Sequence, residues 1–151
     1  MNRFVIDASV AIKWVVAEPG TEEALALLAH TVLAPALWRA ECANILWKKQ
    51  KRGELRAEEA AISARLLDQA GVELCSPEPE LARVFRLALA LDHPAYDCVY
   101  LAAARASQAP LVTADEKLIR VFESARRTAT DRGVILDEIA VFPLVNLPIV
   151  N

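Results

Sequence analysis

The 151-residue chain is poor in the residues that build disulfide frameworks and zinc sites. Its three cysteines, Cys42, Cys75 and Cys98, have neither the even number nor the close spacing of such sites. We therefore expect reduced residues of the hydrophobic core, because a free cysteine usually behaves as a small buried hydrophobe. The two histidines, His30 and His93, also lack ligand spacing, and we interpret them as surface or turn residues.

The chain also lacks an apolar run of the roughly 20 residues that a membrane-spanning helix needs, since its longest such stretches are 98–104 and 139–145. It contains no internal repeat, low-complexity stretch or linker, so we expect a single domain over residues 1–151. A content of 55% hydrophobic and 25% charged residues excludes a disordered chain. The N-terminus enters a strand pattern without the features of a secretory signal, so the expected location is the cytoplasm.

An excess of positive charge is absent as well, because the net charge is −3. Global charge therefore does not indicate nucleic-acid binding, but local charge does. A concentrated basic run contains four side chains that could contact RNA phosphates: Lys48, Lys49, Lys51 and Arg52. The run also precedes Gly53 at a predicted helix end, where cations favour the helix dipole, and both interpretations remain open.

Short apolar segments alternate with helical patterns along the chain. Strands are predicted at 3–6, 32–34, 72–75 and 111–113, and helices at 8–16, 21–29, 36–51, 57–70, 80–91, 95–107 and 115–123. Because parallel strands need crossover connections and are buried on both faces, this alternation predicts an α/β fold with a central parallel sheet. In such sheets, ligands collect beyond the carboxyl ends of the strands.

Four acidic residues stand where an acid is least expected, at a strand end or against a strongly apolar helix: Asp7, Glu41, Asp97 and Asp115. Asp7 and Asp115 follow predicted strands, which places both at the carboxyl edge of the sheet. Asp97 can reach the same edge if its helix runs back from it. A buried carboxylate without a partner is costly, and none of these segments offers a neighbouring Lys or Arg well placed to pair with it.

Each acid has an ordinary structural alternative. Asp7 and Asp115 could cap helices, and Asp97 could favour the positive end of its helix dipole. Glu41 is harder to explain, because it lies within an apolar helix with Asn44 as its polar companion on that face. The joint interpretation is favoured because four separate alternatives would otherwise have to coincide at one sheet edge.

If the four acids meet, they form an anionic pocket that needs a cation. Two carboxylates about 4 Å apart repel each other by roughly 4 kcal/mol at an effective dielectric constant near 20. Oxygen ligands without His or Cys favour a hard ion, Mg²⁺ or Mn²⁺, over zinc. Such an ion can polarise a phosphoryl oxygen and activate water, which suits phosphodiester hydrolysis. Ser9, Asn44 and Thr113 are the predicted neighbours that orient the carboxylates.

The order of these motifs resembles the PIN domain family, specifically the VapC-type toxin ribonucleases of type II toxin–antitoxin pairs. The resemblance runs from Arg3 to about Phe122 and is carried by residues 5–10, 37–44, 96–102 and 112–115. It implies a three-layer α/β/α sandwich and an endoribonuclease that depends on Mg²⁺ or Mn²⁺ held by the four acids. It also implies an RNA substrate, a cognate VapB-type antitoxin and a homodimer. Members of the family cut tRNA, ribosomal RNA or messenger RNA.

The predicted departure from the family pattern is the tail, where residues 124–140 are inserted before a final strand at 141–145. One competing class is a receiver-like signalling domain, which also binds Mg²⁺ at a sheet edge. It would need an acidic pair after the first strand, whereas Ala8 and Ser9 follow Asp7. The alternative that stays open is a PIN-fold module that binds RNA or protein without cutting.

Overall fold

The computed structural model describes residues 1–128, 136–145 and 147, and its centre is a five-stranded sheet in the order β3-β2-β1-β4-β5. Every neighbouring pair of strands is parallel. The strands are β1 (Arg3–Ile6), β2 (Thr31–Ala34), β3 (Glu73–Leu74), β4 (Leu111–Thr113) and β5 (Val141–Pro143). The predicted α/β fold with a central parallel sheet is therefore confirmed.

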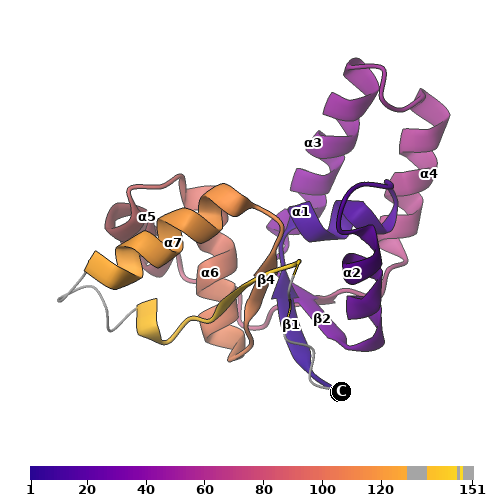
Figure 1. Cartoon of the computed structure of the whole chain (residues 1–151). Helices are drawn as coiled ribbons and strands as arrows, with labels where there is room; N and C mark the ends of the chain where they lie inside the picture. The colour runs from indigo at the N-terminus through magenta and orange to yellow at the C-terminus, as the bar shows by residue number, and fades with distance from the viewer. Residues whose placement is uncertain (129–135, 146, 148–151) are drawn as a thin grey trace.

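Helices flank the sheet on both sides (Figure 1). They are α1 (Ala8–Ala11), α2 (Thr21–Ala26), α3 (Leu37–Lys51), α4 (Ala57–Asp68), α5 (Leu81–Leu91), α6 (Ala95–Ser107) and α7 (Glu116–Thr128), with short 3₁₀ turns η1 (Ile12–Trp14) and η2 (Leu27–Ala29). In Figure 1, α5, α6 and α7 lie to one side of the strands and α2 to the other. Within the described residues, no helix has the combined length and apolarity needed to span a membrane.

The core is built on β1 and on α6, which packs against β1 and β4. Val5 and Ile6 of β1 are fully buried, and so are Ala102 and Ala103 of α6. Small side chains let the helix approach the strands closely, so the sheet and α6 hold each other in a fixed register. The three cysteines are buried and unpaired, as predicted.

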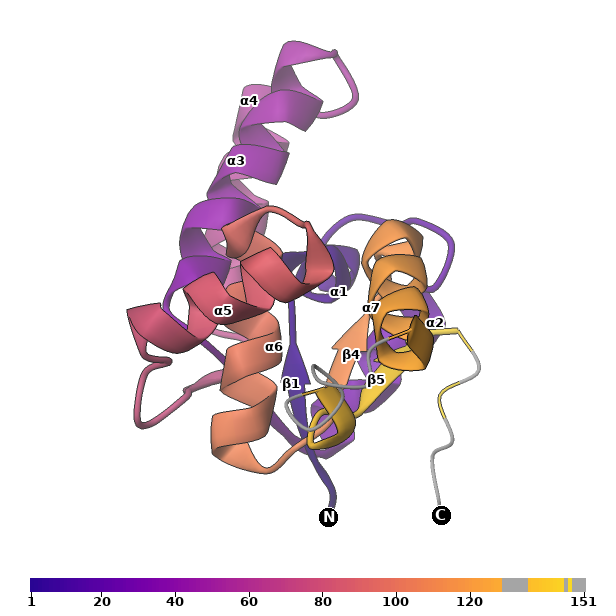
Figure 2. The ribbon, with the colours of Figure 1, turned by 90° about the vertical axis from the view of Figure 1, so that its left-hand side faces the viewer.

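The helices α3 and α4 form a hairpin that projects beyond the rest of the fold in both views (Figures 1 and 2). Its inner face is the stripe Trp38, Cys42 and Leu46 of α3, which repeats every four residues and is buried. Gly53 follows α3 with φ of +74°, a conformation that other residues rarely adopt, and this ends the helix where the sequence predicts.

Several boundaries differ from the prediction. The helix expected over 21–29 is α2 followed by η2, and the strand expected over 72–75 covers only Glu73–Leu74. The helix expected over 8–16 is divided into α1 and η1, because the Trp14 indole donates a hydrogen bond to the Ala24 carbonyl (2.7 Å) and ties this turn to α2. In the tail, α7 continues to Thr128, since Ala125 extends the apolar stripe of Leu118 and Phe122. The first part of the predicted insertion is therefore helical, whereas 129–135 lie outside the described residues.

The final strand exists but is shorter than predicted. β5 covers Val141–Pro143 and pairs with β4 in parallel, with Leu111 opposite Val141. The predicted range of 141–145 overestimates its length, because β4 offers only the three partners Leu111–Thr113.

Candidate functional site

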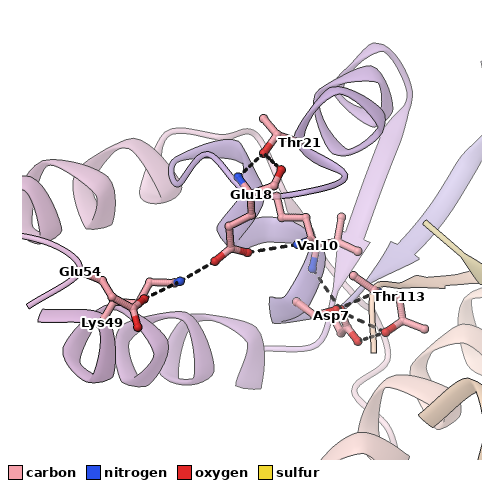
Figure 3. A network of polar contacts seen from close by, with 10 residues as sticks. Asp7, Val10, Glu18, Thr21, Lys49, Glu54 and Thr113 are labelled. Carbon is pink, nitrogen blue, oxygen red and sulfur yellow. Dashed lines mark hydrogen bonds and ion pairs between the residues drawn. The ribbon is translucent and has the colours of Figure 1, made fainter. Parts of the chain in front are cut away.

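The centre of the candidate site is Asp7, which directly follows β1 and is only 6% exposed. Its Oδ1 accepts hydrogen bonds from the Ser9 hydroxyl (2.5 Å) and the Val10 backbone N–H (3.3 Å). Its Oδ2 accepts a hydrogen bond from the Thr113 hydroxyl (2.5 Å). Figure 3 shows Asp7 between Val10 and Thr113. Both carboxylate oxygens are thus held in a fixed direction.

The parallel register explains why these residues meet. Ile6 lies opposite Val112, so the residues that follow on β1 and β4 emerge side by side at the carboxyl edge of the sheet. Ser9 Oγ accepts a hydrogen bond from the Ala114 backbone N–H (2.9 Å), and Thr113 Oγ1 accepts one from that of Asp115 (3.0 Å). The two hydroxyls therefore link the loop after β1 to the loop after β4.

Burial raises the pKa of Asp7 from 3.8 to about 6. The hydrogen bonds from Ser9, Thr113 and Val10 oppose this shift, and the negative charge of Asp115 adds to it. The carboxyl group therefore ionises close to neutral pH, unlike an ordinary aspartate. A cation beside it would favour the ionised form.

Asp115 is the second acid at this edge, and it caps α7. Its Oδ1 accepts hydrogen bonds from the backbone N–H groups of Lys117 (2.9 Å) and Leu118 (3.1 Å). Asp7 likewise caps α1 through Val10. A carboxylate can accept roughly four hydrogen bonds. Within the described residues, Asp7 accepts three and Asp115 accepts two. Each carboxylate can therefore still bind a cation.

Glu41 and Asp97 form a second pair. Glu41 is a half-buried residue of α3, and Asp97 lies in the first turn of α6. Both line an open cleft of about 390 Å³, together with Leu37, Ala40, Asn44, Pro94 and Tyr96. Burial raises the pKa of Glu41, the nearby Tyr100 hydroxyl opposes that shift, and the charge of Asp97 adds to it. Asn44 thus lies in the same cleft as the acid that it was predicted to accompany.

Tyr100 connects the two pairs of acids. It is 1% exposed, and its pKa is raised strongly by burial, then by Glu41 and by Asp7. Although the Tyr100 hydroxyl lies near Glu41, the two groups do not meet in hydrogen-bond geometry. Glu41 Oε1 and the Tyr100 hydroxyl are both buried without a hydrogen-bond partner among the described residues. Such atoms are costly, so Glu41 has an oxygen available to a cation or water.

His93 lies beside Asp97, a contact that the sequence did not predict. Its Nε2 lies 2.6 Å from Asp97 Oδ2, and its side chain is 5% exposed. The interpretation as a surface or turn residue is wrong about the surface, because the ring turns inward from the loop between α5 and α6 and reaches the first turn of α6. The four-residue spacing to Asp97 was the available signal, but Pro94 between them suggested only a break in the helix.

The four acids form two neighbouring pairs instead of one compact cluster. In the part of the chain that the structure describes, no three Asp, Glu, His or Cys side chains stand close enough together to hold one ion. The donor chemistry fits a hard dication, since all four acids offer oxygen and Glu41 has a buried oxygen without a partner. The shared metal site of Asp7, Glu41, Asp97 and Asp115 stays a prediction.

The basic run divides into two kinds of side chain. Lys49 is 12% exposed, and its Nζ lies 2.5 Å from Glu18 and 3.2 Å from Glu54 (Figure 3). Burial alone would raise the pKa of Glu18, but Lys49 and Lys13 together hold it below its ordinary value. The remaining cations of the run are exposed: Lys48, Lys51 and Arg52, of which Arg52 also pairs with Glu54.

Thr113→Val should destabilise the protein although it preserves the shape of the side chain. Thr113 is fully buried, and its hydroxyl serves both Asp7 Oδ2 and the Asp115 backbone N–H. Leaving each group unsatisfied costs roughly 1–3 kcal/mol. Thr113→Ser retains the hydroxyl and is the matched control. Urea unfolding measures both variants, and equal stability of Thr113→Val and wild type would contradict the importance of these bonds.

Comparisons with known proteins agree with this fold. A family model described as "PIN domain" matches residues 4–123. The structure is similar to the crystal structure of PAE2754 from Pyrobaculum aerophilum, with a TM-score of 0.63 and 23% sequence identity over 80% of this chain and 79% of that one. At that identity the likeness shows the fold alone. No curated protein matches the sequence. The chain belongs to the PIN domain family, whose members are generally nucleases.

Proposed function

We propose that this PIN domain is an endoribonuclease dependent on Mg²⁺ or Mn²⁺, and the toxin of a toxin–antitoxin pair. The observation that carries the proposal is the buried Asp7 carboxyl at the carboxyl edge of the sheet. Burial and the charge of Asp115 raise its pKa, and the charges of Asp7 and Glu41 both raise the pKa of Tyr100. An acid with a shifted pKa that lies near other acids at this edge of the sheet is typical of a catalytic centre.

The residues of the chain would divide the work of hydrolysis. Asp7, Glu41, Asp97 and Asp115 would hold the ion, which requires the two pairs to come closer together than they stand in the described structure. When bound, the ion supplies polarisation of the phosphodiester and activation of water. The Ser9 and Thr113 hydroxyls fix the direction of both Asp7 oxygens, and the His93 ring does the same for Asp97 Oδ2.

The proposed partners are RNA, a VapB-type antitoxin and a second copy of the chain, in the cytoplasm. Support comes from two groups among the large apolar side chains that the described structure leaves exposed. One group is Leu81, Phe85 and Leu89 along α5, and the other is Trp47, Ile62 and Leu66 on the hairpin. Monomeric proteins rarely expose large contiguous apolar patches, so these groups favour protein partners.

Cleavage of purified RNA tests the enzymatic function. A mixture of structured and single-stranded RNA is incubated with Mn²⁺ and with wild type, Asp7→Asn or Asp68→Asn. Asp68 is an exposed residue of α4 and provides a matched change of charge. We expect cleavage by wild type and Asp68→Asn but not by Asp7→Asn. Equal cleavage by all three, or none, would count against the proposal. Binding without cleavage would favour the noncatalytic module.

Replacing Lys48, Lys51 and Arg52 together by Gln should make RNA binding less sensitive to salt. These exposed cations are the part of the basic run that can reach phosphates, and each contact to single-stranded RNA contributes about −0.7 to the slope of log K against log salt. Three lost contacts should flatten the slope by about 2. Fluorescence anisotropy across salt concentrations measures it, with Arg126→Gln/Arg127→Gln as the control. An unchanged slope of log K against log salt would mean that the basic run is only a solvated helix end.

A further inference from the structure

The cleft that contains Glu41 and Asp97 has a second, uncharged side. The acids line one part of it, whereas Leu37, Ala40, Pro94 and Tyr96 contribute apolar or aromatic surface. Its volume of about 390 Å³ lies within the range of small-molecule sites. A cleft with this lining can hold a flat, largely apolar group directly beside the acids.

Tyr96 is the least expected residue of this lining. It precedes Asp97 in the first turn of α6, is 69% exposed, and makes no hydrogen bond within the described residues. Tyr100, one turn further along the same helix, is 1% exposed and belongs to the core. The ring at position 96 is therefore not required for packing, and one of its faces is available to a ligand.

Asn44 adds hydrogen-bonding capacity to the same cleft. Its side chain is exposed, and no hydrogen bond within the described part of the chain engages its amide. An amide offers both donors and an acceptor, which is the complement of a nucleobase edge. Without a cation, Glu41 and Asp97 repel an RNA phosphate from this cleft, whereas a nucleobase carries no net charge and can lie against its uncharged side.

We propose that this cleft binds an unpaired nucleobase of RNA beside the scissile phosphodiester, with Tyr96 as the stacking surface and Asn44 as the hydrogen-bonding group. This inference rests on the proposed ribonuclease function and specifies its substrate as single-stranded at this position. A base within an A-form duplex is stacked on its neighbours and cannot enter, whereas a base in a loop can be splayed out onto an aromatic side chain.

Binding to a fluorescent RNA tests the subsite. The probe is a short oligoribonucleotide without self-complementarity that carries one 2-aminopurine, whose emission falls when it stacks. Binding is measured with Asp7→Asn protein in Mg²⁺, so that the probe stays intact, and the same probe annealed to its complement is compared. Tyr96→Leu keeps apolar bulk but removes the aromatic face. Tyr96→Phe keeps the face, and Leu28→Ala changes an exposed apolar residue of η2 outside the cleft.

We expect Tyr96→Leu to weaken single-strand binding by about 10-fold and to abolish the quenching, because one base–aromatic stack has an effect of this order. Tyr96→Phe and Leu28→Ala should behave like the parent, and the duplex should bind less tightly. Unchanged binding and quenching in Tyr96→Leu, or equal binding of duplex and single strand, would overturn the subsite. A change of oligomeric state in Tyr96→Leu would also overturn it, because Tyr96 would then belong to a protein interface.

Cleavage by the chain with native Asp7, measured alongside in Mn²⁺, separates the two proposals. Cleavage that is equally fast in wild type and Tyr96→Leu would remove the subsite and leave the nuclease. Tyr96-dependent quenching without cleavage by wild type would keep the base-binding cleft and remove the nuclease.

Discussion

Asp7→Asn should abolish RNA cleavage and, in metal-free buffer above pH 6, raise the melting temperature of the protein. The loss of activity follows from removing the charge of the most buried of the four acids. The gain in stability follows from the pKa of Asp7, which burial raises from 3.8 to about 6. This difference in pKa means that ionised Asp7 lowers the free energy of unfolding by about 3 kcal/mol. In a protein of this length, each change of 1 kcal/mol in the free energy of unfolding shifts the melting temperature by about 2–4 °C.

The pH dependence has a definite sign. An acid whose pKa is higher in the folded state binds its proton more tightly there, so folding is favoured as pH falls from about 6 toward 3.8. In EDTA, wild type should therefore lose stability between pH 5 and pH 7.5, whereas Asp7→Asn should lose less. Adding Mn²⁺ at pH 7.5 should stabilise wild type, because a bound cation favours the ionised carboxylate.

Asparagine can occupy this position without losing the hydrogen bonds. Its Oδ1 can still accept from Ser9 and Val10, and its Nδ2 can donate to Thr113 Oγ1. Thermal melting of wild type, Asp7→Asn and Asp68→Asn in EDTA from pH 5 to pH 7.5 measures the effect. A lower melting temperature for Asp7→Asn at pH 7.5, with the pH dependence of wild type retained, would show that the ionised carboxylate stabilises the fold.

The sequence predicts the backbone of this site better than its side-chain contacts. The strands before Asp7 and Asp115 are short apolar runs, and parallel pairing of adjacent strands brings their carboxyl ends together. The positions of those two acids at one edge therefore follow from local pattern and topology. The separation of the four acids into two pairs does not, because it depends on where the tertiary fold places α3, which carries Glu41, and α6, which carries Asp97.

Two residues, Lys49 and His93, make contacts that the sequence pattern did not predict, because these contacts depend on the tertiary fold. Lys49 belongs to a basic run by composition, yet Glu18 from the loop before α2 holds its ammonium group. His93 follows the left-handed residue Asp92, whose φ of +48° ends α5 and turns the ring toward Asp97. The local alternation of apolar and polar residues indicates neither contact. Glu18 lies 31 positions from Lys49, and the turn at Asp92 leaves no mark in that pattern.

His93→Leu should weaken both Mn²⁺ binding and RNA cleavage by about 10- to 100-fold, the usual effect of losing a partner that orients a metal ligand. With its Nε2 protonated, the His93 ring donates to Asp97 Oδ2 at 2.6 Å. Leucine fills most of the buried volume but offers no donor, so Asp97 would be free to adopt other rotamers. His93→Gln is the matched variant, because its amide can restore a donor to Asp97.

Mn²⁺ affinity separates orientation of Asp97 from simple packing. Calorimetric titration with Mn²⁺ and thermal melting in EDTA are compared for wild type, His93→Leu and His93→Gln. If His93 positions Asp97, His93→Gln should recover most of the affinity even if both variants lose some melting temperature, since neither side chain reproduces the imidazole shape. Equal Mn²⁺ affinity in all three proteins would mean that the His93 ring only fills space between α5 and α6. Equal loss in both variants would mean that Asp97 depends on the imidazole itself, because a donor alone would then not suffice to hold the carboxylate.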